Sequence, residues 1–254
     1  MNRILAASIL SFSLGALIPS TASAALANYT KGHGDIGIAY EGGLWNLHVH
    51  LSQFAVLDGI PLAAAQEFSP GDIAIVVPNP TAARPGSSTW IPLGISAGQP
   101  FWFLPKSQDV NKPFLGFGTE ELDPGDWVGD ISLKLTAISG TGVSAGGFFT
   151  LWDTDTFGDK TFYWTSADGL GVTDVLTVGA GTHSHNNMAF TKAGTYDITI
   201  QAMATHVDDG VIVGSATYRF DVAPIPEPTT ATFTGLFCIG AAALRRRRSR
   251  PLHA

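Results

Sequence analysis

Cysteine, charged residues and long apolar runs are all scarce in this chain. Cys238 is the only cysteine among 254 residues, which excludes a disulfide scaffold and any zinc or iron–sulfur site built on several thiolates. Charged residues make up only 14% of the chain, and its net charge of −7 argues against nucleic acid as a partner. The apolar stretches near the two ends fall short of the roughly 20 residues that a permanent membrane span needs.

Helical periodicity is also missing between residues 28 and 223. The chain has instead 45% hydrophobic residues, 29 glycines and 15 prolines, a composition that can bury a core and favours turns over long helices. Period-two alternation recurs in short segments between turn signals, which predicts strands at 35–40, 44–51, 72–77, 101–104, 131–138, 147–152, 161–164, 174–178, 195–202 and 211–222. We therefore predict an all-β domain, a single antiparallel β-sandwich of the Ig-like or jelly-roll-like type.

Two segments of this domain lack a strand pattern. Residues 61–68 are compatible with one short helix or with a loop. Residues 78–98 are rich in proline, glycine and serine, which predicts a long loop.

Residues 1–27 have the pattern of a secretory signal peptide. Arg3 supplies the positive charge, an apolar stretch follows, and Ala22, Ser23 and Ala24 form a small-residue cleavage pattern. The alternative is an N-terminal membrane anchor, for which the apolar stretch is short. We expect signal peptidase to cleave near this pattern and the protein to be exported.

The last part of the chain has three consecutive features. Pro226, Glu227 and Pro228 come first, the mostly apolar segment 229–244 follows, and Arg245, Arg246, Arg247 and Arg248 close it. A basic block after an apolar segment stays in the cytoplasm, so the segment would act as a stop-transfer helix. This order resembles the PEP-CTERM sorting signal of Gram-negative bacteria, which implies recognition and cleavage by an exosortase. An ordinary tail anchor with a basic flank is the alternative.

The predicted organisation is thus a signal peptide at 1–27, a β-sandwich surface domain at 28–223 and a sorting tail at 224–254. Without the two ends, 8 basic residues face 20 acidic ones, which leaves a net charge of about −12. Such a surface repels polyanions and attracts divalent cations. We expect the protein in the cell envelope, at the cell surface or in the extracellular matrix, held in the membrane transiently by its C-terminal helix. Exopolysaccharide or envelope components are the expected partners.

Histidines occur in same-face pairs. In the segment 44–51, strand alternation places His48 and His50 on one face and the apolar residues on the other. Two such residues stand roughly 7 Å apart at their Cα atoms, twice the rise of a strand, which suits two ligands of one cation. His183 and His185 repeat this spacing after a turn-like segment.

A fifth imidazole and a carboxylate, His33 and Asp35, occur near the start of the domain. Imidazole and carboxylate donors without thiolate suit divalent transition metals such as zinc, copper or manganese. We therefore predict one shared metal site with the ligands His48, His50, His183 and His185, joined by His33 and Asp35. The alternative is scattered surface histidines. His206 is predicted to be a turn residue.

The histidine segments also resemble a known family. The strings at 181–190 and 194–196, the opening 32–36, the strand 48–50 and the segments 152–158 and 166–169 are similar to strings of the surface-anchored domain called choice-of-anchor M. The resemblance covers most of residues 28–222, and it departs at Met188, where the family commonly has tryptophan. Some members are associated with metal-uptake transporters, so the resemblance supports a metal site. We therefore predict a non-catalytic binding or structural module with a histidine-based metal site.

Other functions remain open at this point. A glycan-binding module with incidental histidines would use exposed aromatic residues, for which Trp102, Trp127 and Trp164 are the candidates. A metalloenzyme would need an open coordination position and a nearby base. The acidic segment 153–159 resembles the start of a calcium loop, but Phe157 occupies the third ligand position and Trp164 stands at position twelve, where a glutamate is needed. We therefore predict an ordinary acidic turn. The sequence also lacks the glutamate that a cupin site needs after His50, a Gly-x-Ser-x-Gly elbow and a glycine-rich phosphate loop.

Overall fold

The computed structural model describes residues 25–79 and 81–226, and most of its regular structure is β-strand. The predicted signal peptide, apart from its last three residues, lies outside the described residues, and so does the predicted sorting tail from Glu227 onward. The described part is all-β, as the sequence predicts.

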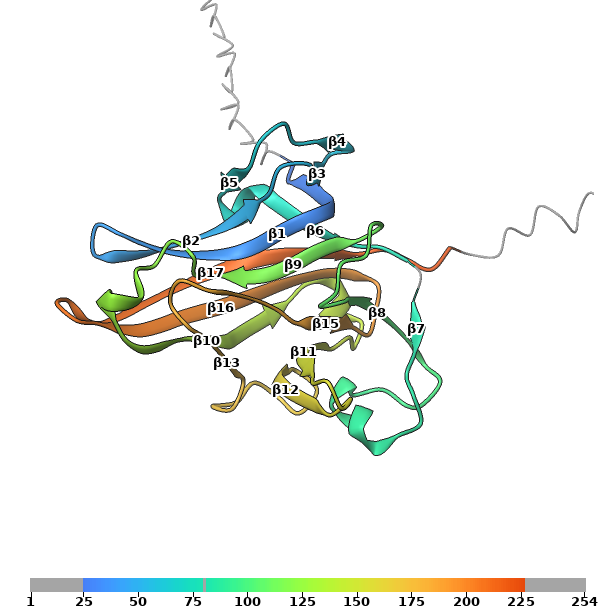
Figure 1. Cartoon of the computed structure of the whole chain (residues 1–254). Coiled ribbons are helices and arrows are strands. Elements are labelled where there is room, and N and C mark those ends of the chain that lie inside the picture. The colour runs from blue at the N-terminus through green and yellow to red at the C-terminus, as the bar shows by residue number, and fades with distance from the viewer. Residues whose placement is uncertain (1–24, 80, 227–254) are drawn as a thin grey trace, which may run out of the picture.

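Twelve of the described strands form one large sheet. Its main path runs β13 (Val175–Val178), β10 (Trp127–Ser139), β16 (Gly194–His206), β17 (Gly210–Val222), β6 (Ile73–Val77), β1 (Ala27–Glu41), β2 (Leu44–Leu51) and β5 (Gln66–Phe68). Two further strands pair with β1, namely β9 (Pro113–Gly118) and β3 (Val56–Leu57), and each has one more partner, β14 (His183–His185) beside β9 and β4 (Ile60–Pro61) beside β3. The long strands β10, β16 and β17 cross the middle of the molecule (Figure 1).

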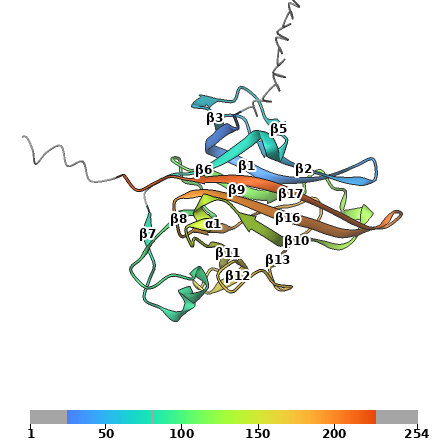
Figure 2. The same ribbon diagram turned by 180° about the vertical axis from the view of Figure 1, so that it is seen from behind.

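A smaller sheet packs against these long strands. Its order is β12 (Lys160–Thr165), β11 (Phe149–Thr154), β15 (Asn187–Phe190), β8 (Pro100–Leu104) and β7 (Ala82–Ala83). Both Figure 1 and the reverse view in Figure 2 place β11 and β12 below β10 and β16. The two sheets therefore form a sandwich-like arrangement.

Helices are short in the described part of the chain. They are the 3-10 turns η1 (Pro70–Asp72), η2 (Ser88–Leu93) and η3 (Pro124–Asp126) and the α-helix α1 (Thr141–Ser144). No helix within residues 25–79 and 81–226 is long and apolar enough to cross a membrane. The segment 61–68 contains no helix, and the segment 78–98 is mostly loop but contains β7 and η2.

The core between the two sheets is rich in aromatic side chains. Phe149 and Phe190 of the small sheet pack on Phe220 of β17, with ring centroids 6.3 and 5.2 Å apart. All three are at most 1% exposed, and burial of each such side chain contributes about 1.5–3 kcal/mol. The period-two pattern of the sequence thus places its apolar face where the sheets meet.

Tyr196, near the start of β16, holds the connection between β15 and β16 in place. Its hydroxyl donates a hydrogen bond to the carbonyl of Lys192 at 2.9 Å and accepts one from the Lys192 amide at 3.1 Å. A tyrosine that bonds back to the backbone a few residues upstream fixes a corner between strands in sandwich folds. The connection that leads into the longest antiparallel pair is therefore held by a side chain.

The large sheet is not purely antiparallel. Among the described strands, β1 runs parallel to β6 and to β9, and β6 runs parallel to β17. The prediction of a wholly antiparallel sandwich is wrong for these three pairs. Parallel neighbours need long connections, so local turn signals in the sequence do not reveal them.

Strand β1 changes partners at Gly32. Its first residues pair with β6 and β3, whereas Gly32–Gly37 pair with β9 and the residues from Gly34 pair with β2. Gly32 has a φ of +90°, and a Cβ there would lie 2.7 Å from Cα of Ala55, so only glycine fits. Tyr29 donates a hydrogen bond to the Gly32 carbonyl at 2.7 Å and fixes the bend. The bend carries the following residues, His33 and Asp35, toward β9 and β14.

Candidate metal centre

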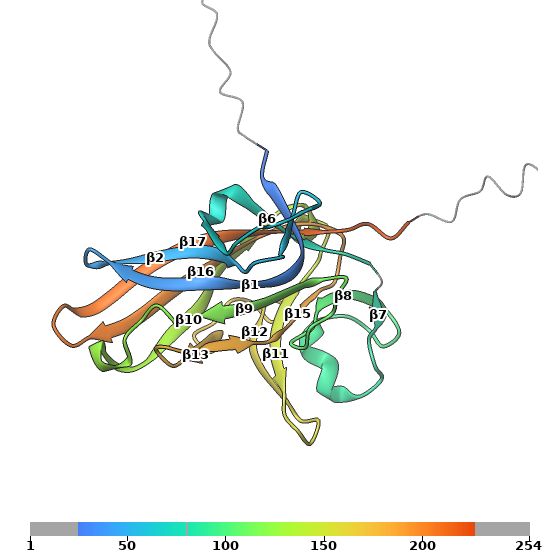
Figure 3. The same ribbon diagram turned by 45° about the horizontal axis from the view of Figure 1, so that its top comes forward.

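All six predicted ligands lie on one face of the sheet formed by β5, β2, β1, β9 and β14. Figure 3 shows β2, β1 and β9 side by side, and β14 pairs with the far edge of β9. The opposite face of these strands carries buried apolar residues such as Ile36, Val49 and Phe117. We call the polar face the histidine face; its residues in register are Glu67, His50, Asp35, Gly116 and His185 in one row, and His48, Gly37, Gly118 and His183 in the next.

Glycines in the middle of the histidine face make room for the side chains at its edges. A Cβ on Gly116 would collide with Oδ1 of Asp35 and lie 3.0 Å from Nδ1 of His185. A Cβ on Gly37 would collide with the ring of His48. The absence of side chains at these positions therefore lets the imidazoles of His48 and His185 lie close to the backbone of β1 and β9.

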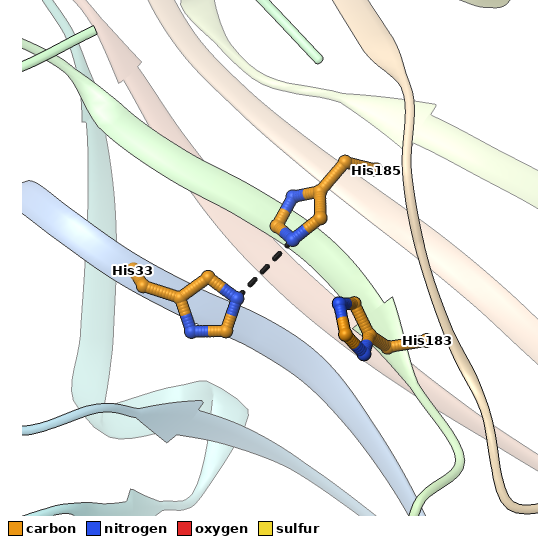
Figure 4. Close-up of side chains that lie close together, drawn as sticks. All are labelled: His33, His183 and His185. Atoms are coloured by element: carbon orange, nitrogen blue, oxygen red, sulfur yellow. Dashed lines mark hydrogen bonds between the residues drawn. The ribbon is translucent and has the colours of Figure 1, made fainter. Parts of the chain in front are cut away.

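Three of the histidines converge. His33 from β1 and His183 and His185 from β14 each offer a ring nitrogen, and these three atoms lie within 4.8 Å of one another. The Nε2 atoms of His33 and His185 are 3.2 Å apart, although 152 residues separate the two in the chain. Figure 4 shows the three rings turned toward one another over β1 and β9. Three imidazoles in this arrangement can hold one divalent ion.

Polar side chains outside the cluster contact two of these rings at Nδ1. Nδ1 of His183 lies 2.8 Å from Oε1 of Glu120, a carboxylate oxygen that can accept a proton from this nitrogen. Nδ1 of His33 hydrogen-bonds the hydroxyl of Ser52 at 2.7 Å. Metal-binding histidines usually make such a bond through the nitrogen that does not ligate. Both rings therefore have a polar neighbour at Nδ1, the nitrogen that would not bind the ion.

The third ring, His185, is held by stacking. It lies flat on Phe114 of β9, with ring centroids 3.7 Å apart and an angle of 3° between the planes. Burial, with His33 as the next cause, lowers the pKa of His185 to about 4. The ring is therefore neutral at pH 7, which is the form that binds a metal.

Asp35 adds a carboxylate beneath the three histidines. Its side chain is only 4% exposed, its Oδ2 lies 3.5 Å from Nε2 of His33, and its Oδ1 has no hydrogen-bond partner. Burial raises the pKa of Asp35, while the nearby His33 opposes that rise. A buried carboxylate without a full set of partners is costly, and a cation at the three histidines would offset that cost.

His48 and His50 do not join this cluster. They lie on β2, three strands from β14, which corresponds to about 14 Å at the usual strand spacing. His48 instead lies with Glu67 and Glu121, and His50 stands in register between Asp35 and Glu67. The prediction of one site for all six residues is therefore corrected to a cluster of His33, His183 and His185 with Asp35 beside it.

The sequence reasoning missed the residues that complete the site. Ser52 and Phe114 carry no motif, and the Glu120–Glu121 turn after β9 has no spacing that relates it to a histidine. The pairing of β9 between β1 and β14 brings Phe114 and the Glu120–Glu121 turn to the rings, whereas Ser52 meets His33 at the end of the β1–β2 hairpin. Local sequence patterns contain no signal for such a pairing.

The three tryptophans predicted as a sugar platform are core residues. Trp102, Trp127 and Trp164 are 4%, 7% and 1% exposed, which corrects that prediction. His206 ends β16, and its Nδ1 accepts backbone hydrogen bonds from Asp208 and Asp209, as expected of a turn residue.

The acidic segment 153–159 forms a turn that is held by hydrogen bonds to the carboxylate of one of its own residues. Oδ1 of Asp155 accepts hydrogen bonds from the backbone amides of Phe157 and Asp159. This is the ordinary acidic turn that the sequence predicts.

Comparison of the chain with protein-family models, with curated proteins and with solved structures gives no match, so the chemistry of the site is argued from its geometry alone.

Proposed function

We propose that this protein is an exported, non-catalytic surface module that binds one divalent transition-metal ion through His33, His183 and His185. The observation that carries the proposal is the convergence of three imidazole nitrogens within 4.8 Å, two of them on rings held through Nδ1. If surface histidines lay close together only by chance, polar partners at their Nδ1 atoms would not be expected.

The donor set favours zinc or copper. Imidazole suits these ions, whereas magnesium and calcium prefer oxygen ligands. Asp35 is placed to occupy a fourth position after a small movement of its carboxylate, because its Oδ2 already lies 3.5 Å from Nε2 of His33. A site closed by a fourth protein ligand is typical of structural or binding sites, whereas catalytic zinc keeps a position for water.

The positions of the chain ends support export and processing. Strand β1 begins at Ala27 and β17 ends at Val222. Cleavage after Ala24, and separately at the tail beyond Pro226, would leave every described strand whole. The proposal therefore includes a signal peptide, a PEP-CTERM tail processed by an exosortase and a choice-of-anchor M domain of Ig-like or jelly-roll-like type.

Metal analysis of the untagged protein tests the site. We expect one equivalent of zinc or copper to bind, with at least a tenfold loss of affinity in His33→Ala and in His183→Ala. His206→Gln removes an imidazole far from the cluster in the fold and should keep the affinity. If the parent protein binds no ion, or if both cluster variants bind as tightly as the parent, the proposal fails.

Glycan binding is a second candidate function, and a surface pocket away from the three-histidine cluster supports it. Its volume is about 390 Å³, and its lining includes the aromatic residues Trp90 and Phe103 and the polar residues Lys160 and Asn187. An aromatic wall with amide and ammonium groups suits a sugar ring. Binding on a glycan array that is lost in Trp90→Ala and is insensitive to a chelator would favour this function over the metal site.

A further inference from the structure

The structure assigns a second divalent-cation site to His48, Glu67 and Glu121, at the edge of the histidine face opposite to the three-histidine cluster. It is separate from the proposed metal centre and does not depend on it.

Three donors from three parts of the chain meet here. His48 comes from β2, Glu67 from β5 and Glu121 from the turn after β9, and one ligand atom of each lies within 4.8 Å of the others. Nε2 of His48 is 3.2 Å from Oε1 of Glu121. The histidine side chain is 4% exposed and that of Glu121 is 43% exposed, so a buried nitrogen faces carboxylates that reach solvent.

The hydrogen bonding of His48 leaves this nitrogen without a partner. Nδ1 lies 3.3 Å from the carbonyl oxygen of Asn46, which can only accept, so Nδ1 carries a proton. In the neutral ring Nε2 then holds a lone pair, and it makes no hydrogen bond. A lone pair and a carboxylate oxygen 3.2 Å apart repel each other unless a positive charge lies between them. That charge is either a metal ion or a second proton on the ring.

The site also has room and access for an ion. A hollow of about 220 Å³ lies beside it, lined by Asn46, Leu47, His48, Glu67, Phe68 and Ser69. Because Glu67 and Glu121 are exposed, an ion can enter from solvent and keep some of its water. The ring of His48 cannot move inward, since it already lies against the backbone of Gly37.

The chemistry of the donors differs from that of the three-histidine cluster. Two carboxylates and one imidazole favour an ion with an oxygen-rich shell, such as Mn²⁺, more than three imidazoles do. His48 and Glu67 lie on β2 and β5, whereas His183 and His185 lie on β14, with β1 and β9 between these strands, and the two sets of donors have no residue in common. The two groups therefore bind two ions rather than share one.

Titration of the full protein with Mn²⁺, followed by electron paramagnetic resonance, tests this site. We use the double variant His33→Ala/His183→Ala as the background, which leaves a single histidine of the three-histidine cluster and so separates this test from the proposed metal centre. We expect one Mn²⁺ to bind in this background, and its affinity to fall at least tenfold on adding Glu67→Gln or Glu121→Gln. Both substitutions are at exposed positions, so loss of folding does not confuse the measurement.

Glu120→Gln is the matched control. It removes the same charge from the neighbouring residue, whose carboxylate faces His183 instead, and it should leave Mn²⁺ affinity within twofold. The inference is overturned if Glu121→Gln and Glu120→Gln weaken Mn²⁺ binding equally, because the loss would then reflect the removal of one negative charge and not of a ligand. It is also overturned if no Mn²⁺ binds, in which case a proton on His48 balances the carboxylates.

Discussion

Glu120 and Glu121 are neighbours in the chain, yet their carboxylates contact histidines of different groups. Oε1 of Glu120 lies 2.8 Å from Nδ1 of His183, and Oε1 of Glu121 lies 3.2 Å from Nε2 of His48. The turn after β9 therefore reaches both edges of the histidine face. A movement of this turn would alter the two groups together, although each group has its own set of donors.

Removal of the Ser52 hydroxyl should weaken the three-histidine site without unfolding the protein. Ser52 bonds Nδ1 of His33 at 2.7 Å, and loss of such an orienting contact typically costs 10- to 100-fold in metal affinity. We expect Ser52→Ala to lower zinc affinity about tenfold in a competition titration. Ser184→Ala removes a hydroxyl that bonds Asn186 rather than a histidine, so equal losses in the two variants would contradict the role of Ser52.

The stability of the metal-free protein should depend on pH through His185. The pKa of this ring is about 4 in the folded protein and near 6.5 in the unfolded chain, so the unfolded state binds more protons between these values. His185 therefore lowers stability progressively as the pH falls from 6.5 to 4. Asp35 acts in the opposite sense, because its pKa is raised on folding and ionisation at higher pH costs stability.

A comparison of variants isolates the histidine contribution. Urea midpoints of the parent protein and of His185→Gln, measured with a chelator at pH 7.5, 6 and 5, should diverge as the pH falls, with the parent losing more. Parallel curves for the two proteins would mean that His185 is not titrating in a buried position.

A methyl group at Gly116 should disrupt the site through contact alone. The Cβ of Gly116→Ala would collide with Oδ1 of Asp35 and press on His185, so either the carboxylate or the ring must move. We expect loss of metal binding and a decrease of about 1–3 kcal/mol in the free energy of unfolding. Gly71→Ala adds the same methyl group where nothing lies within 4 Å and should change neither quantity. Unchanged metal affinity in Gly116→Ala would show that the glycine is not needed.

Tyr196 and Tyr218 offer a matched pair for the fold. The Tyr196 hydroxyl makes two backbone hydrogen bonds to Lys192, whereas the buried Tyr218 hydroxyl has no hydrogen-bond partner. Tyr196→Phe should lower the free energy of unfolding by about 1–3 kcal/mol, and Tyr218→Phe should be neutral or stabilising. Chemical denaturation of both variants measures this, and a larger loss in Tyr218→Phe would refute the assignment of the corner.

Sequence patterns predict the local part of this structure well. Strict alternation in 44–51 correctly gives β2 and the face that His48 and His50 share, because the side-chain period of a strand is a property of the backbone. Whether the site residues meet depends instead on strand order. His33 reaches His185 because β9 lies between β1 and β14, and β14 is only three residues long. No periodicity in a segment of this length specifies its partner.

The parallel pairs show the same division between local and long-range information. Turn signals predict hairpins, and β16 and β17 form a hairpin that turns at Asp209 and Gly210, as the sequence predicts. The placement of β6 between β1 and β17 depends on burial of Ile73 and Ile75 in a core assembled from distant segments. The apolar run at 72–77 predicts burial but not neighbours.

The parallel contact between β6 and β17 has a mechanical consequence for a chain held at its C-terminal side. Residues Arg219–Val222 are bonded on one edge to β6 and on the other to β16. Tension applied beyond Val222 along the axis of β17 would load these bonds in shear and distribute the force over many of them at once. Strands that are peeled apart from one end rupture one bond at a time, so the fold resists a pull at Val222 more strongly than a peeling geometry would.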